Sequence, residues 1–268
     1  MKVRIRDNNF AHGHSSCHGR KPSHFIWDRK IYKSKVCFFT DNSLQQASND
    51  PAEIKIGWLC EPKAINPSIY KWVVNNHHVF DYILTYDREL CKIDKKFLFY
   101  PHSGCWIDDE SINVCNKTKF CSIIASNKKS TEGHKLRHKV INEFNNKIDV
   151  FGRGYTPIEN KLIGLKDYKY HIVIENSKQD DYFTEKIIDS LSVGTIPIYY
   201  GTDNIDNYFN GIIKFNSMEE LKEIVSSIEE DPHHYKNNIF NVESNIESIK
   251  QYKVAEDYIF TNYNYIFN

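Results

Sequence analysis

The sequence lacks the features that mark a protein held in a membrane or stapled by disulfide bonds. It has no run of about 18 apolar residues, and its opening segment MKVRIRDNNF has no apolar core of signal-peptide length. The seven cysteines are odd in number and all lie in the first half. Cys37 and Cys121 fall inside apolar, strand-like segments. This usage favours reduced thiols, and we expect a soluble, cytoplasmic protein.

An excess of charge of one sign is also missing, because 35 basic residues balance 35 acidic residues. A chain with zero net charge has no bulk attraction for nucleic acid or for an anionic membrane surface, and we expect neither as a partner. The content of 40% hydrophobic and 26% charged residues is ordinary for a globular protein. The sequence leaves the oligomeric state open.

Several catalytic and nucleotide-binding motifs are absent as well. The sequence has no G-x4-G-K-[ST] phosphate loop, no G-x-S-x-G hydrolase elbow and no D-x-D motif that would hold a metal–diphosphate. Gly152-Arg153-Gly154 supplies a G-x-G, but the rest of the dinucleotide fingerprint is missing. These absences disfavour a phosphate-loop nucleotidase and a serine hydrolase.

Metal-ligand residue types gather near the start of the chain, at His12, His14, Cys17, His18 and His24. Their spacing fits no standard zinc site, because there is no C-x2-C pair and no H-x3-H with a distant partner. A zinc-dependent hydrolase is therefore a distant alternative. We expect a polar loop that lines a substrate cleft, and no metal.

The stretch 168–201 carries the clearest periodic pattern in the chain. His171–Ile174 and Thr195–Tyr200 are apolar and rich in β-branched residues, which predicts buried strands. Between them, apolar residues at helical spacing predict a helix that Gly194 ends. A strand–helix–strand unit implies a parallel sheet with a ligand crevice at its carboxyl edge.

The predicted helix places a cation where it is unfavourable. If Thr184 is the N-cap, Lys186 falls in the first turn and opposes the helix dipole by about 0.3–1 kcal/mol. A bound anion such as a diphosphate would reverse that sign. A solvated surface lysine is the alternative interpretation.

A second strand–helix–strand unit precedes this stretch, with strands at Phe120–Ala125 and Ile148–Phe151 around a helix at Gly133–Asn145. The first hundred residues predict a β/α domain of their own, with strands at 2–7, Val36–Thr40, Ile54–Leu59, Phe80–Leu84 and Phe97–Tyr100. We place the domains at 1–110 and 111–240, followed by a helical tail, 241–268, that packs back on the first domain.

The stretch 168–201 closely resembles the signature of the α-1,3-fucosyltransferase family, the family-ten glycosyltransferases. The matching residues are Tyr168-Lys169-Tyr170, Glu175-Asn176-Ser177, Asp181-Tyr182-Phe183-Thr184-Glu185-Lys186, Gly194, Pro197 and Gly201. Residues 120–154 look like the family's strand, Ser-Asn turn, basic helix and return strand. The first half resembles the family only weakly, through Glu61-Pro62 and Phe80-Asp81-Tyr82.

The resemblance implies an α/β, GT-B-like architecture of two Rossmann-like domains facing across a cleft. It implies an inverting, metal-independent glycosyltransferase that needs no cofactor and moves a sugar, most simply fucose from GDP-fucose, onto a glycan hydroxyl. The alternatives are another donor such as GDP-mannose, or a catalytically silent nucleotide- or carbohydrate-binding module. Retention of the Glu185-Lys186 pair disfavours the silent module.

The resemblance also implies roles for single residues. Lys186 and an arginine would hold the diphosphate; we choose Arg137 and keep Arg153 as its rival. Glu185 would contact the donor sugar, and Tyr182 would line the nucleotide pocket. The other residues assigned to the donor site are Glu175, Asn176, Ser126 and Asn127.

The first domain would supply the general base, because an inverting displacement needs one group to deprotonate the acceptor hydroxyl. Glu61 is the candidate, directly after a predicted strand. Relatives commonly have Ser-Pro after this glutamate, whereas here Pro62 follows Glu61 directly. Asp41 and the His12–His24 group therefore remain alternatives.

Overall fold

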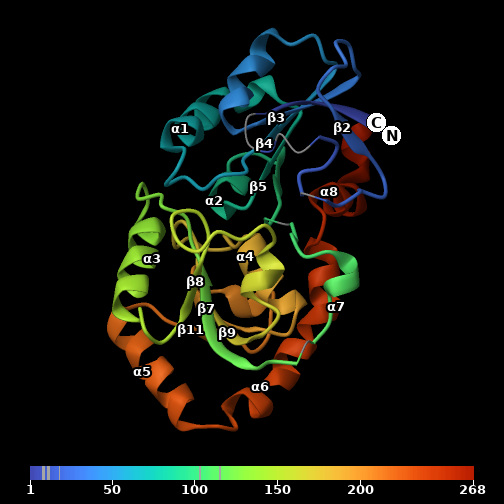
Figure 1. Ribbon diagram of the computed structural model, residues 1–268. Coiled ribbons are helices and arrows are strands. Elements are labelled where there is room, and N and C mark those ends of the chain that lie inside the picture. Colours follow the sequence, from blue (N-terminus) through green and yellow to red (C-terminus); the bar gives the residue numbers. More distant parts are fainter. Residues whose placement is uncertain (8–9, 11–12, 18, 103, 115) are drawn as a thin grey trace. The chain divides into compact units, whose positions relative to one another are not determined.

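The computed structural model describes residues 1–7, 10, 13–17, 19–102, 104–114 and 116–268 (Figure 1). The chain forms two compact units, one of residues 1–104 with 251–268 and the other of residues 105–250. The C-terminal segment 251–268 thus belongs to the first unit. The sequence placed the boundaries at 110/111 and 240/241.

The first unit is built on a six-stranded sheet in the order β2-β1-β3-β4-β5-β6, and each pairing between these strands is parallel. The strands are β1 (Lys2–Arg6), β2 (Ile26–Asp28), β3 (Val36–Thr40), β4 (Ile54–Trp58), β5 (Tyr82–Thr85) and β6 (Phe97–Phe99). The helices are α1 (Pro67–Asn76), α2 (Arg88–Cys91) and α8 (Ala255–Tyr263). The sequence did not predict β2, because three residues are too few to show a period.

A buried carboxylate ties α8 to the N-terminal segment of the first unit. Glu256 is fully buried and accepts hydrogen bonds from the indole Nε1 of Trp27 and from the backbone N–H of Ser16. Burial raises the pKa of Glu256 above its usual value, and these donors oppose that shift. Because a buried polar group needs its partners, the contacts fix the position of α8 in this unit.

The second unit has a five-stranded parallel sheet in the order β11-β10-β9-β7-β8. The strands are β7 (Lys119–Ile124), β8 (Asp149–Phe151), β9 (Tyr168–Ile174), β10 (Ile196–Tyr200) and β11 (Ile213–Lys214). The helices are α3 (Glu132–Glu143), α4 (Glu185–Ser192), α5 (Met218–Glu230), α6 (His234–Glu243) and α7 (Asn245–Ile249). Figure 1 shows α3 on one side of this sheet and α4 with α7 on the other.

The strand order of the second unit reverses between β7 and β9. The crossover β7–α3–β8 runs toward one edge of the sheet, and the crossover β9–α4–β10 runs toward the other. In open parallel sheets, ligands bind outside the carboxyl ends of the strands at such a switch point. The fold therefore predicts a site at Ala125–Asn127, which follows β7, and at Glu175–Ser177, which follows β9.

The predicted α/β class is confirmed in its two parallel sheets. The ends of α4 are also as predicted: the Thr184 hydroxyl caps the backbone N–H of Lys186 at 3.4 Å, and Gly194 follows the helix with a φ of +71°. No helix in the described part of the chain is both long and apolar enough to cross a membrane.

Candidate functional site

A cavity of about 260 Å³ lies in the second unit at the carboxyl ends of β7, β8 and β9. Five of the residues that the sequence assigned to a binding site line it: Ser126, Arg137, Arg153, Glu185 and Lys186. Three further polar residues line it that the sequence did not single out: Lys161, His171 and Asp189. The cavity therefore combines four cationic side chains with two carboxylates at the switch point of the sheet.

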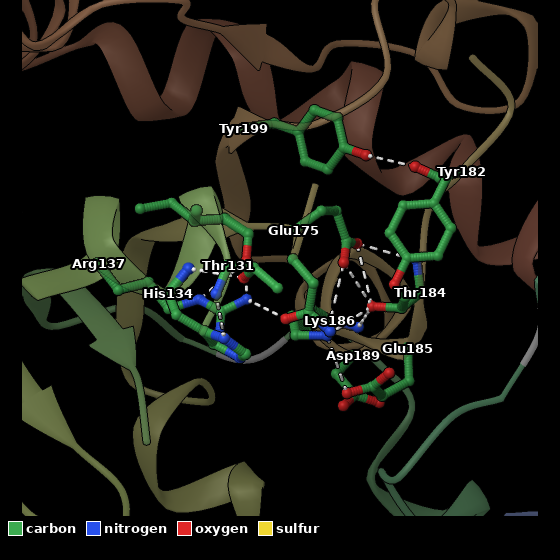
Figure 2. Close-up of polar contacts among 12 residues, drawn as sticks. Thr131, His134, Arg137, Glu175, Tyr182, Thr184, Glu185, Lys186, Asp189 and Tyr199 are labelled. Carbon is green, nitrogen blue, oxygen red and sulfur yellow. Dashed lines mark hydrogen bonds and ion pairs between the residues drawn. The ribbon is translucent and has the colours of Figure 1, made fainter. Parts of the chain in front are cut away.

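Lys186 is half-buried at the first turn of α4, as its sequence position predicted. Its Nζ donates to the Thr184 hydroxyl at 2.8 Å and to Glu175 Oε2 at 3.4 Å. Glu185 Oε1 lies 3.5 Å away (Figure 2). The carboxylates compensate the unfavourable position of this cation at a helix N-terminus.

Glu175 is the buried carboxylate that holds this cluster in place. It is fully buried and accepts from the backbone N–H of Thr184 at 2.8 Å and from the Thr184 hydroxyl at 2.8 and 3.0 Å (Figure 2). A buried carboxylate needs such donors because desolvation otherwise disfavours its charge. Glu175 does not line the cavity, so its role here is to hold the start of α4 and Lys186 in place.

Arg137 projects from α3 toward the end of β9 and is almost fully buried. Its Nε and Nη2 donate to the carbonyl of Ile174, the former at 3.0 Å, and Nη2 also donates to Asn176 Oδ1 at 3.0 Å. Burial lowers the pKa of this arginine, and the nearby Glu175 and Glu185 oppose the shift. The guanidinium is therefore a rigidly held cation at the cavity wall.

Gly133 lets α3 approach this turn closely. Its N–H donates to the carbonyl of Asn176 at 3.2 Å, and a Cβ at this position would lie 1.7 Å from the carbonyl oxygen of Glu175. Thr131 caps the helix in a reciprocal capping box with His134. The glycine and the cap together set the distance between Arg137 and the end of β9.

Arg153, the rival of Arg137, lies between Gly152 and Gly154 after β8 and is exposed. Both arginines line the cavity, so the structure brings both to the site. Arg137 is the more firmly fixed of the two, through Ile174 and Asn176.

Lys161, which follows β8 in a short 3-10 helix (Lys161–Gly164), bridges two carboxylates of α4. Its Nζ lies 2.8 Å from Asp189 Oδ2 and 3.2 Å from Glu185 Oε1. Lys161 could not be singled out from the sequence, because a loop lysine has no periodic context. Asp189 had a usable signal: it is an acidic residue between Ile188 and Ser190 on the buried part of a helix.

His171 is a buried histidine of β9 whose ring lines the cavity. Its Nδ1 lies 2.8 Å from the Ser122 hydroxyl, which donates to the carbonyl of Gly164 at 2.5 Å. With its proton directed at Gly164, Ser122 accepts from Nδ1–H, and the neutral ring presents Nε2 as an acceptor. Burial, followed by the charge of Lys161, lowers the pKa of His171 to about 3.

The remaining predicted residues of the second unit lie around the cavity. Tyr182 is 1% exposed and lies outside the set of lining residues; its carbonyl accepts from the Tyr199 hydroxyl at 3.5 Å. Asn176 is half-buried and acts through Arg137, as described above. Asn127 is exposed beside Ser126.

Glu61 belongs to the first unit and follows β4, as predicted. Its side chain is half-buried, and its backbone N–H donates to Asp41 Oδ2 at 3.1 Å. The Tyr70 hydroxyl donates to its carbonyl at 3.0 Å. Asp41 is fully buried with a φ of +39°, so it fixes the backbone at Glu61 from a strained position.

The His/Cys segment near the start of the chain is described only in part, because His12 and His18 lie outside the described residues. His14 Nδ1 contacts the carbonyl of Trp27 at 3.2 Å, Cys17 is buried, and the ring of His24 stacks on Phe260. Within the residues that the structure describes, no group of three or more His, Cys, Asp or Glu side chains is arranged to hold a metal ion.

Two units, each built on a parallel sheet, with a cation-lined cavity at the switch point of the second sheet, are the architecture expected of a GT-B-like glycosyltransferase. Residues 114–262, more than half of the chain, match the sequence model described as glycosyltransferase family 10 (fucosyltransferase), C-terminal part. The chain therefore belongs to this family, as the motif at 168–201 indicated.

Individual relatives agree with the family match. The α-(1,3)-fucosyltransferase FucT of Helicobacter pylori is 32% identical over 117 residues, which cover 41% of this chain and 23% of the relative. The bovine 3-galactosyl-N-acetylglucosaminide 4-α-L-fucosyltransferase FUT3 is 27% identical over 137 residues, which cover 47% and 37%. The chain thus spans well under two thirds of the length of these curated relatives.

A crystal structure of an α1,3-fucosyltransferase with GDP-fucose resembles this fold with a TM-score of 0.58 at 17% identity. The superposition covers 90% of this chain and 80% of the other. At this identity the likeness establishes the shared fold.

Proposed function

We propose that this protein transfers fucose from GDP-fucose to a hydroxyl group of a glycan acceptor. The proposal extends to inversion at the anomeric carbon, to independence from metal ions and cofactors, and to a cytoplasmic location. Membership of the fucosyltransferase family and the likeness to a fold solved with GDP-fucose support the transfer of fucose.

One observation carries the proposal: two fixed cations, Lys186 and Arg137, line one cavity at the switch point of the five-stranded sheet in the second unit. The hydrogen bonds of Arg137 use Nε and Nη2, and among the described residues Nη1 has no acceptor. A diphosphate would accept from Nη1 and from the ammonium of Lys186. It would also lie at the N-terminus of α4, where the helix dipole favours an anion.

The proposed reaction breaks the bond between the sugar C1 and the diphosphate oxygen, and GDP leaves with the electron pair. The acceptor oxygen forms the new bond to C1 from the opposite face. Positive charge that develops on the sugar ring is stabilised by the carboxylate of Glu185, and negative charge on the leaving diphosphate is stabilised by Lys186 and Arg137.

The proton of the acceptor hydroxyl passes to the Glu61 carboxylate in this scheme. The backbone at Glu61 is held by Asp41 and by the hydroxyl of Tyr70, which suits a base that must be placed accurately. Asp41 is less suited, because it is fully buried and its oxygens accept from the N–H groups of Cys60 and Glu61.

The direct test is transfer of labelled fucose from GDP-fucose to a panel of glycans in the presence of EDTA, with the anomeric configuration of the product read by NMR. The proposal expects a labelled glycan of inverted configuration. Transfer from GDP-mannose in its place would reassign the donor. Binding of GDP without transfer or hydrolysis of any GDP-sugar would identify a silent binding module.

A further inference from the structure

A short chain of contacts reaches Glu185 from Trp106 through Asp189 and Lys161. The backbone N–H of Trp106 donates to Asp189 Oδ1 at 2.7 Å, and the opposite oxygen, Oδ2, lies 2.8 Å from Lys161 Nζ. The same Nζ lies 3.2 Å from Glu185 Oε1 and 4.8 Å from the centroid of the Trp106 ring. All four residues belong to the second unit.

The chain of contacts holds Lys161 as a charged group. Burial disfavours the ammonium, but Asp189 and then Glu185 offset it, so the pKa of Lys161 is raised overall. The side chain of Asp189 is only 2% exposed, so its charge depends on this cation. Lys161 is therefore anchored at Asp189 and presents its charge to Glu185.

Glu185 lies between two ammonium groups, because Lys186 Nζ is 3.5 Å from the same oxygen. In the proposed reaction Lys186 serves the diphosphate, so its charge is shared with the donor when the donor binds. In the proposed reaction Lys161 is not assigned to the diphosphate. It is the cation that continues to face Glu185 while the sugar bond breaks.

We propose that Lys161 is a positioning residue for Glu185: it keeps the Glu185 carboxylate ionised and oriented toward the donor sugar through an ion pair anchored at Asp189. The inference rests on the proposed function, since it assigns Lys161 a part in stabilising the sugar during transfer. It predicts an effect on turnover rather than on the affinity for GDP, which lacks the sugar.

Three variants separate this role from a purely structural one. Lys161→Met removes the charge but leaves the Asp189 carboxylate buried without its cation, so it can also destabilise the fold. The double variant Lys161→Met/Asp189→Asn removes both charges, so no buried carboxylate is left without its cation. Lys161→Arg keeps a cation that can bridge the two carboxylates. Lys222→Met, which breaks the exposed pair with Glu143, is the matched control.

Kinetics give the first readout. For the double variant we expect a melting temperature near that of the wild type, a kcat lowered about tenfold or more and an unchanged Kd for GDP. The acid limb of its pH–kcat profile should move upward, because Glu185 loses an ammonium group 3.2 Å away and the loss of the Asp189 charge offsets this change only in part. Lys161→Arg should restore most of kcat. A well-folded double variant with wild-type kcat and an unmoved acid limb overturns the proposal.

A second readout does not depend on activity. In the ligand-free protein, ¹³C-detected titration of the Glu185 carboxyl should show a higher pKa in the double variant than in the wild type, and no change in Lys222→Met. An unchanged pKa of Glu185 overturns the inference even if the enzyme transfers fucose. A wild-type protein that neither binds nor uses GDP-fucose instead refutes the proposed function, while the titration still decides the Lys161–Glu185 coupling.

Discussion

Lys186 Nζ donates at 2.8 Å to the hydroxyl of Thr184, the residue that caps its own helix. The same hydroxyl donates to Glu175. The cap, the buried carboxylate and the cation are therefore joined by hydrogen bonds at the start of α4. The arrangement holds a positive charge at a helix N-terminus before any anion arrives. A ligand with a diphosphate would then find the cation already in place.

Removing this cation should abolish most of the activity. For Lys186→Met we expect kcat/KM for GDP-fucose to fall about 10- to 100-fold, because a charged hydrogen bond to the diphosphate contributes roughly 1.5–3 kcal/mol. Steady-state kinetics measure the change, with Lys222→Met as the control for loss of an exposed lysine. Near-wild-type turnover in Lys186→Met would remove Lys186 from the mechanism.

The second cation should not be replaceable by lysine. Arg137 holds the carbonyl of Ile174 and the amide of Asn176 with one planar group, and a single ammonium cannot reproduce that fork. We expect Arg137→Lys to weaken GDP binding about tenfold, as measured by calorimetry. The parallel variant Arg153→Lys should have little effect; the reverse order of sensitivities would make Arg153 the diphosphate ligand.

The close approach of α3 to the end of β9 should not tolerate a methyl group. In Gly133→Ala the new Cβ meets the carbonyl oxygen of Glu175, so the helix must shift. We expect a loss of about 1–3 kcal/mol in the free energy of unfolding, together with weaker GDP binding because Arg137 moves with the helix. Lys135→Ala, an exposed position on α3, is the control. Wild-type stability and GDP affinity in Gly133→Ala would contradict this packing.

His171 should make the fold sensitive to acid. Its pKa is about 3 in the folded protein against 6.5 for an ordinary histidine, so between these values the unfolded chain binds a proton that the native state does not. Stability should fall as the pH drops below 6.5, by at most about 1.4 kcal/mol per pH unit.

The variant His171→Asn keeps a donor for Ser122 but cannot titrate. Denaturant unfolding at pH 7 and pH 5 should therefore show a smaller loss for the variant, by up to about 2 kcal/mol. Equal losses in the two proteins would show that His171 does not contribute to the acid sensitivity.

Glu61→Gln tests the proposed base in the first unit. We expect kcat to fall about 10²- to 10⁴-fold, since the amide cannot take a proton, while the affinity for GDP is unchanged. Pre-steady-state transfer and calorimetry measure the two quantities separately. A variant that retains kcat would move the base to another residue, and one that loses GDP binding would give Glu61 a structural role.

Local signals account for what the sequence predicted correctly. The strand β9, the cap Thr184 and the terminating Gly194 depend on neighbours in the chain, so their pattern is visible in the sequence. The helix position of Arg137 was predictable for the same reason. The family motif then joined these local elements into one site.

Contacts between distant segments could not be predicted in this way. Lys161 meets Asp189 and Glu185 only because the 3-10 helix after β8 folds against α4. The burial of an aromatic ring is equally hard to predict: Tyr182 is 1% exposed and does not line the cavity, and its role in a nucleotide pocket stays a prediction.

The most direct test of the central claim is a calorimetric titration of GDP and of UDP into the wild-type protein and into Lys186→Met. The second-unit cavity should give one binding site per chain in the wild type, with GDP preferred over UDP. The GDP affinity should fall at least about tenfold in the variant. Absence of GDP binding in the wild type, or equal affinities in the two proteins, would contradict a donor site built on Lys186.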